Sequence, residues 1–112
     1  MKFSMKLKKQ YFDMIKNGEK TYEIRLYDEK RQQISLGDTI EFSLDNGLEK
    51  IECVVKETLF APNFKTLLNF LPIKKVGFES VEKALETCYQ IYTKEQEKEF
   101  GVIAINIDLK TK

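Results

Sequence analysis

The first part of the chain changes between two kinds of hydrophobic spacing. Residues 2–8 alternate apolar and polar side chains, which predicts a short strand. From about Lys9 to Asn17 the apolar positions follow a helical period, and Gly18 supplies a C-terminal stop for that helix. Residues 20–27 return to strict alternation, which predicts a second strand directly after the glycine.

The middle of the chain carries the signals of a β-hairpin. Residues 28–33 form a polar connector, after which Gly37-Asp38 turns into the alternating run 39–44. Asp45-Asn46-Gly47 is a hairpin turn signal, and it is followed by a long strand from about Lys50 to Phe60 that is rich in β-branched residues. We therefore expect two adjacent antiparallel strands here.

Helical spacing then replaces alternation until the last strand. The apolar positions of residues 64–71 predict a short amphipathic helix, and Ser80 is a suitable N-cap for another helix. The apolar stripe of that second helix contains Val81, Ala84, Leu85, Cys88 and Tyr92. The charge run 94–99 is typical of a solvated helix end or turn, whereas residues 100–107 are apolar enough for a strand buried in a sheet or barrel.

The order β-α-β-β-β-α-α-β argues against a repeated parallel βαβ architecture. We expect an α+β fold over residues 1–112 as a single domain, in which about five strands form a small mixed β-barrel and about three helices pack around it.

Charge and composition exclude several classes of function. Charged residues make up 33% of the chain, but 19 Lys and Arg nearly cancel 18 Asp and Glu, so a protein that coats duplex DNA is not expected. Lysines interrupt the N-terminal segment too often for a signal sequence, and no apolar run is long enough to span a bilayer. We therefore expect a cytoplasmic, soluble protein with no membrane partner.

The cysteine and histidine content limits the chemistry further. Cys53 and Cys88 are the only cysteines and histidine is absent, so no zinc site, other metal site or cofactor is expected. Both cysteines fall on apolar faces, where they are best interpreted as buried small hydrophobic residues. The absence of histidine also excludes a triad or general base that uses an imidazole.

The segment after the first helix carries the candidate chemistry. Alternation places Glu23 and Arg25 together on one face, opposite core-facing neighbours, and Lys20 begins the same strand. One carboxylate flanked by two cations suits a nucleobase or nucleotide, because Glu accepts from an exocyclic amine and Arg binds phosphate or a base edge. A surface ion pair contributing ~0–1 kcal/mol is the alternative interpretation.

These residues also belong to a recognisable pattern. Gly18-x-Lys20-x-x-Glu23-x-Arg25 resembles the GxKxxExR signature of ASCH domains, which are members of the PUA-like superfamily. The resemblance extends to the preceding helix, to the step from Ile34 through Gly37-Asp38 into the next strand, and to the closing strand that begins at Phe100.

The resemblance implies a PUA-like β-barrel with a ligand cleft between barrel and helices, and RNA or a nucleotide as the partner. By position, Lys20, Glu23 and Arg25 would face the ligand and Gly18 would serve the turn. The residues that follow directly would form the cleft's rim: Tyr27 as a stacking platform, and Lys30 and Arg31 as phosphate contacts, with a solvated loop as the alternative.

The sequence leaves two further questions open. Tyr89 and Tyr92 can stack on a base or pack in the core or at its rim, and nothing in the sequence indicates the oligomeric state. One enzymatic branch of the family, the acetylcytidine amidohydrolases, has a Lys that Lys20 matches and a Thr where this chain has Glu23. A binding module without catalysis is therefore the main hypothesis, and an amidohydrolase of acylated nucleosides that uses Lys20 and Glu23 is the alternative.

Overall fold

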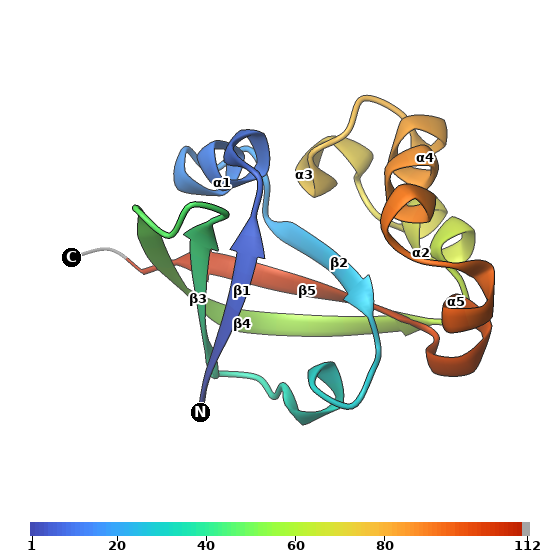
Figure 1. The fold of residues 1–112 in the computed structure, drawn as a ribbon, viewed down its shortest axis with the longest axis horizontal. Coiled ribbons are helices and arrows are strands. Elements are labelled where there is room, and N and C mark those ends of the chain that lie inside the picture. Colours follow the sequence, from blue (N-terminus) through green and yellow to red (C-terminus); the bar gives the residue numbers. More distant parts are fainter. Residues whose placement is uncertain (111–112) are drawn as a thin grey trace.

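All five strands join one mixed sheet. The computed structural model describes residues 1–110. The strand order is β1-β3-β4-β5-β2, and every neighbouring pair is antiparallel except β1 and β3, which run parallel (Figure 1). The strands are β1 (Lys2–Leu7), β2 (Tyr22–Leu26), β3 (Thr39–Leu44), β4 (Lys50–Ala61) and β5 (Val102–Leu109).

The sheet curls because different parts of the long strand β4 pair with β3 and with β5. The first part of β4 pairs with β3 and most of its length pairs with β5, with a register shift between Val55 and Glu57. Such an irregularity bends a strand and increases its twist. The curling brings the two edge strands towards each other, so that the sheet forms a half-barrel.

Side chains rather than backbone bonds connect the two edges. No ladder joins β1 to β2 within residues 1–110. Instead, Arg25 on β2 donates to the carbonyl of Lys6 at 3.1 Å, and Lys30 beyond β2 donates to the carbonyl of Ser4 at 2.7 Å. Cationic side chains thus satisfy carbonyls on the free edge of β1.

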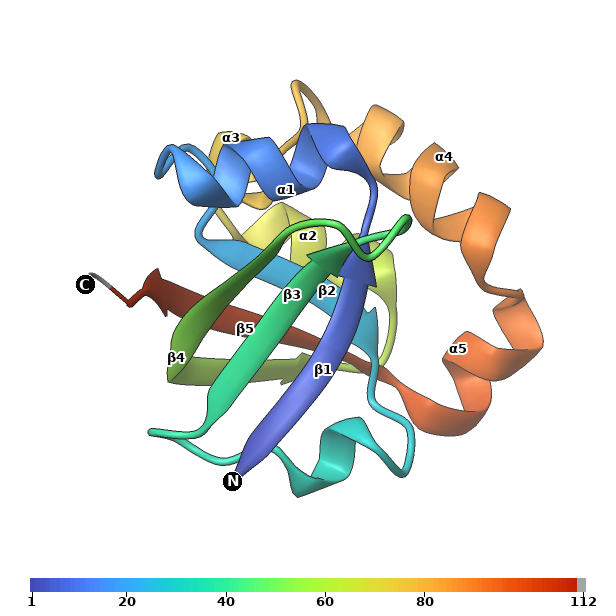
Figure 2. The same ribbon diagram turned by 60° about the vertical axis from the view of Figure 1, so that its left-hand side comes forward.

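Helices pack around the curled sheet. They are α1 (Lys9–Lys16), α2 (Phe64–Phe70), α3 (Ile73–Val76), α4 (Val81–Ile91) and α5 (Lys94–Phe100), with a 3-10 turn at Arg31–Gln33. α1 contacts β3, α2 contacts β4 and β5, and α3 contacts β2. Figures 1 and 2 show α1 and α4 on the same side of the molecule, above β2.

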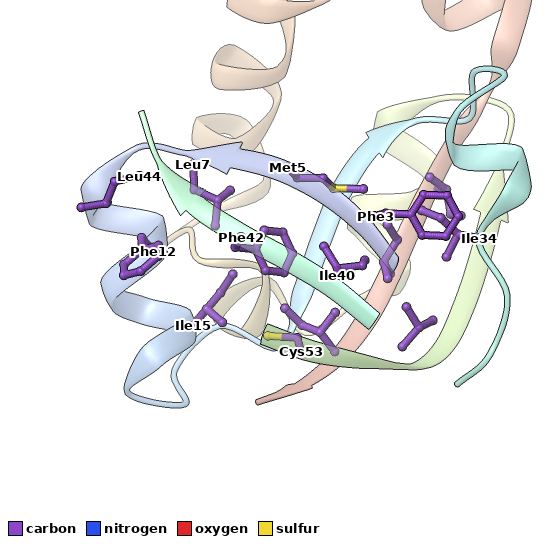
Figure 3. Close-up of a cluster of buried hydrophobic side chains, with 14 residues drawn as sticks. Phe3, Met5, Leu7, Phe12, Ile15, Ile34, Ile40, Phe42, Leu44 and Cys53 are labelled. Carbon is purple, nitrogen blue, oxygen red and sulfur yellow. The ribbon is translucent and has the colours of Figure 1, made fainter. Parts of the chain in front are cut away.

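Two hydrophobic cores lie on either side of the curled sheet. The first fills its concave side with alternate residues of β1 and β3 and with Phe12 and Ile15 of α1 (Figure 3). The second lies under the helices that follow β4, where Phe64 and Leu68 of α2 and Ala84 of α4 are fully buried. The charged segment at the start of β2 runs between these two cores.

The expected α+β fold with five strands is confirmed. The expected number of helices is too low, because α3 and α5 were not predicted as helices. The charge run 94–99 is a helix that begins with a capping box between Thr93 and Gln96, and Glu97 within it is 6% exposed rather than solvated. Among the described helices, none has the length and apolar character needed to cross a membrane.

Candidate functional site

A cleft of about 360 Å³ opens where β1 ends and α1 begins. Its walls come from Lys6 to Lys8, from the first turns of α1, and from the C-terminal half of α4. β2 contributes Glu23, Ile24 and Arg25, and Lys20 lies just before that strand. Asp45 lies in the turn after β3 and also lines the cleft, which therefore combines segments from four parts of the chain.

Lys20 is held at the base of the cleft by a full set of acceptors. Its side chain is 3% exposed, and its Nζ donates to the carbonyls of Tyr22 and Val76, both at 2.6 Å. The third partner is Glu23 Oε1 at 3.1 Å. An ammonium group has three N–H bonds, so these three acceptors satisfy it and favour its charged form.

Local backbone geometry explains how Lys20 reaches this position. Gly18 has φ +88°, a left-handed conformation that ends α1 and turns the chain. The N–H of Lys20 then donates to the Met14 carbonyl at 3.0 Å, and the N–H of Thr21 donates to the Lys75 carbonyl at 2.8 Å. The start of β2 is thereby fixed against both α1 and α3.

Glu23 joins the two cations of the site. Its side chain is 8% exposed, with Oε1 bound to Lys20 and Oε2 bound to Nε of Arg25 at 2.7 Å. Burial alone would raise the pKa of Glu23, but the ammonium and the guanidinium outweigh it and hold that pKa below the ordinary value. Burial lowers the pKa of Lys20, and the Glu23 carboxylate opposes this lowering.

Lys20, Glu23 and Arg25 form a charged trio, and Arg25 is its member that faces the cleft. Its side chain is 15% exposed, more than those of the other two residues. Glu23 and the Lys6 carbonyl each accept one of its N–H groups, and Tyr92, which also lines the cleft, lies beside the guanidinium. Burial opposes its charge, but Glu23 and Tyr92 raise the pKa of Arg25, so the guanidinium is a permanent cation here.

The fold and the comparisons with known proteins agree. Residues 5–111 match the ASCH domain family. The chain belongs to the ASCH domain family. A crystal structure of hypothetical protein PH0355 is 38% identical, with a TM-score of 0.88 over 98% of this chain and 100% of that chain. A solution structure of protein PF0455 from Pyrococcus furiosus is 33% identical, with a TM-score of 0.78 and full coverage of both chains.

More distant relatives share the fold alone. A mutant ZmASCH protein from Zymomonas mobilis is 13% identical, with a TM-score of 0.65 over 94% of this chain and 66% of that chain. An ASCH domain from Lactobacillus crispatus is 13% identical, with a TM-score of 0.66 over 96% of this chain and 79% of that chain. No curated protein matches the chain at a significant level.

The ASCH cleft carries a local excess of positive charge. It is lined by four cationic and two acidic side chains, and the charge of one acidic residue, Glu23, is already neutralised by its two cationic partners. The full set is Lys6, Lys8, Lys20, Arg25, Glu23 and Asp45. Aromatic side chains complete the walls, with Tyr11 from α1, Phe78 from the segment before α4, and Tyr92 at the end of α4.

The three expected rim residues lie outside the lining of the cleft. The Tyr27 ring packs against the first core and meets Phe60 edge-on, with ring centroids 4.8 Å apart. Lys30 binds the Ser4 carbonyl, and Arg31 pairs with Asp28 at 2.9 Å. The structure therefore brings Lys20, Glu23 and Arg25 together and leaves these three residues on the adjoining connector.

The two tyrosines of α4 have different surroundings. The Tyr89 hydroxyl donates to the buried Glu97 carboxylate at 2.8 Å, which also accepts from the first N–H of α2 at 2.7 Å. The Tyr92 ring stacks on Phe64 and also lines the cleft. Tyr89 therefore has a packing role, whereas Tyr92 is at once a packing residue and a wall of the site.

Several lining residues were not anticipated from the sequence. Lys6 and Lys8 alternate with apolar residues, as any solvated strand face does. Thr87 and Gln90 lie on the polar side of a helix whose apolar stripe was the only signal. Their common location depends on the curling of the sheet, for which local spacing gives no signal.

Proposed function

We propose that this ASCH domain binds RNA or a nucleotide in the cleft, with Arg25 as its principal ligand contact. One observation carries the proposal: a permanent cation is held rigidly at the cleft wall by a buried carboxylate that is itself fixed by Lys20. A guanidinium with N–H groups left over suits phosphate or the acceptor atoms of a base. The other cations of the cleft and its aromatic walls support the same class of ligand.

Roles within the trio divide on the basis of burial. Arg25 contacts the ligand, whereas Lys20 and Glu23 are positioning residues whose polar atoms already have partners. Lys6 and Lys8 lie at the end of β1 and extend the positive potential towards the rim, where a phosphate of RNA would pass. Tyr27, Lys30 and Arg31 become secondary contacts that only a ligand longer than one nucleotide would reach.

Binding is tested by titrating the protein with uridine 5′-monophosphate and with short single-stranded RNAs. Arg25→Met should weaken binding about tenfold or more, because a hydrogen bond to a charged group contributes about 1.5–3 kcal/mol. Lys56→Met is the matched control, since Lys56 is 57% exposed and lies outside the cleft lining. Equal affinities for the Arg25 and Lys56 variants would remove the role claimed for Arg25.

The amidohydrolase alternative rests on the burial of Lys20 beside Glu23 at the cleft. Burial lowers the pKa of this lysine, as a nucleophile or general base requires. Against it, all three N–H groups of the ammonium already have acceptors, and no lone pair is free to attack a ligand. Incubation with N4-acetylcytidine decides the matter: release of cytidine above a protein-free control would establish hydrolysis and overturn a purely binding role.

A further inference from the structure

β2 is an edge strand, and its free edge opens into the cleft. The Thr21 carbonyl accepts from the Ile107 N–H at 2.9 Å, and the Tyr27 N–H donates to the Gly101 carbonyl at 3.0 Å. The register between β2 and β5 is regular, so the odd-numbered residues of β2 direct their main-chain groups towards β5. The even-numbered residues direct theirs the other way.

Ile24 is therefore left with an unpaired main-chain donor and acceptor. The Tyr22 carbonyl, which has the same orientation, accepts from Lys20, which confirms the direction of this edge. Within residues 1–110, neither the N–H nor the C=O of Ile24 has a hydrogen-bond partner. Because β1 ends at Leu7 and the chain then turns into α1, no strand lies opposite Ile24 to pair with it.

The free edge lies at the functional cleft. Ile24 is one of the cleft's lining residues, between Glu23 and Arg25. Between the facing edges of β1 and β2, the carbonyl of Lys6 on β1 already accepts a hydrogen bond from Arg25. The Ile24 side chain packs against the second core, so we take the unpaired main-chain donor and acceptor as its contribution to the wall, next to the cation that would hold a phosphate or a carbonyl oxygen.

The chemistry of this edge selects a type of ligand. A residue in a strand presents its N–H and C=O side by side in one direction, as it does to a partner strand. A planar group with an acceptor beside a donor complements that pair, and every nucleobase has such an edge: uracil has a carbonyl beside N3–H, and cytosine has N3 beside its amine. Glu23 cannot serve this purpose, because both of its oxygens are bound to cations.

We propose that the main chain of Ile24 binds the hydrogen-bonding edge of a nucleobase, making this stretch of β2 the base subsite of the cleft. The inference rests on the proposed function and adds to it how the base is bound. Because all four bases carry a suitable edge, a main-chain subsite accepts any of them with little discrimination. The walls formed by Tyr11, Phe78 and Tyr92 are the surfaces available to the base's faces.

Three probes separate base binding from phosphate binding: uridine 5′-monophosphate, its N3-methyl derivative, and ribose 5-phosphate. N3-methylation removes the donor and adds bulk at the edge that Ile24 would contact. We expect the methylated nucleotide to bind about tenfold more weakly than the parent, because a site built around hydrogen bonds rejects an analogue that cannot make them. Ribose 5-phosphate should bind weakly and without involving Ile24.

Amide NMR of the wild-type protein gives a readout at the atom concerned. Uridine 5′-monophosphate should shift the Ile24 N–H resonance downfield and protect it from exchange, and the N3-methyl compound should not. Equal binding of both nucleotides with an unmoved Ile24 amide would overturn the base subsite while leaving nucleotide binding intact. If none of the three probes and no short RNA binds, both the proposed function and this inference are wrong.

Ile24→Pro tests the same point by substitution. Proline lacks the N–H, and this N–H bonds no strand, so the change costs no ladder bond and proline is tolerated at such edge positions. With Ile24→Val as control, we expect only the proline variant to lose affinity for the nucleotide, while both retain their affinity for ribose 5-phosphate. Full nucleotide affinity in a folded proline variant would contradict the proposal, and if that variant does not fold, the wild-type NMR titration decides.

Discussion

Replacing Lys20 with Met tests whether this lysine holds the site together rather than touching the ligand. Methionine retains most of the apolar length of the side chain but removes the ammonium. The carbonyls of Tyr22 and Val76 then lose their shared donor, and Glu23 keeps only Arg25 as a counter-ion in a buried position. Removing one partner of a buried ion pair costs about 3–5 kcal/mol where the other charge is left uncompensated. Because Arg25 still compensates Glu23, we expect a loss near the lower end of that range, to which the two carbonyls left without a donor contribute.

The expected loss is large relative to the whole stability of a small domain. Domains are stable by about 5–15 kcal/mol, and for one of about 100 residues each kcal/mol shifts the melting temperature by roughly 4–8 °C. Lys20→Met should therefore melt at least ~12 °C below the wild type. Urea denaturation followed by circular dichroism at neutral pH measures the free energy of unfolding directly.

Lys16→Met is the matched control for this measurement. Lys16 pairs with Glu49 at 3.2 Å, but the two side chains are 55% and 53% exposed, so their ion pair should contribute only ~0–1 kcal/mol. If the two lysine variants differ in unfolding free energy by less than about 1 kcal/mol, the buried interactions of Lys20 with Glu23 and the two carbonyls do not stabilise the protein as argued. Combining Lys20→Met with Glu23→Gln provides a second check, since neutralising the carboxylate should make the loss of Lys20 less costly.

Three other measurements follow from the burial of ionisable groups. Because the pKa of Glu23 lies below its ordinary value of 4.5, its stabilising contribution is present above that pH and is lost as the pH falls through the lower, folded-state pKa; Glu23→Gln should flatten the acid limb of a pH–stability curve, and an unchanged limb would contradict this. Glu97→Ala should destabilise by about 1–3 kcal/mol in urea denaturation, because it leaves the Tyr89 hydroxyl and a helix N–H unpaired, whereas a neutral effect would mean that water replaces the carboxylate. Burial raises the pKa of Cys53 and of Cys88 to about 12, so neither thiol should react with iodoacetamide at pH 8 until the protein unfolds, and mass spectrometry of the native protein would reveal any early labelling.

The alternation of β2 was enough to predict that Glu23 and Arg25 share a face, and the structure joins them at 2.7 Å. It was not enough to predict what covers that face. The sequence predicts that these two side chains leave the sheet together, to face a ligand or to form a surface ion pair, yet Glu23 is buried. The curling of the sheet brings β1 and α1 over this face, and that curling depends on the pairing of β4 with two strands, which no local pattern reveals.

Helix α5 was also not predicted, again because its environment depends on contacts between residues distant in the sequence. Thr93 and Gln96 form a capping box, a local signal that the sequence does contain, but the dense charge after it favoured a solvated interpretation. Glu97 is buried because it accepts the N–H of Phe64, 33 residues away, and the hydroxyl of Tyr89. A buried carboxylate is identified by its partners, and partners this distant in sequence are known only once the chain is folded.

Burial of the lysine and glutamate also decides which variants can report on ligand binding. Lys20 and Glu23 hold Arg25 in place, and Lys20 also ties β2 to α3 through Val76. Substituting either of them therefore disturbs both folding and the site, and a loss of binding in such a variant does not distinguish contact from support. Arg25 differs, because it is the most exposed of the three side chains and its substitution leaves all three acceptors of Lys20 in place. A ligand-contact role then requires that Arg25→Met lose more affinity than its loss of stability explains, whereas Lys20→Met should recover affinity whenever low temperature or a stabilising osmolyte restores its fold.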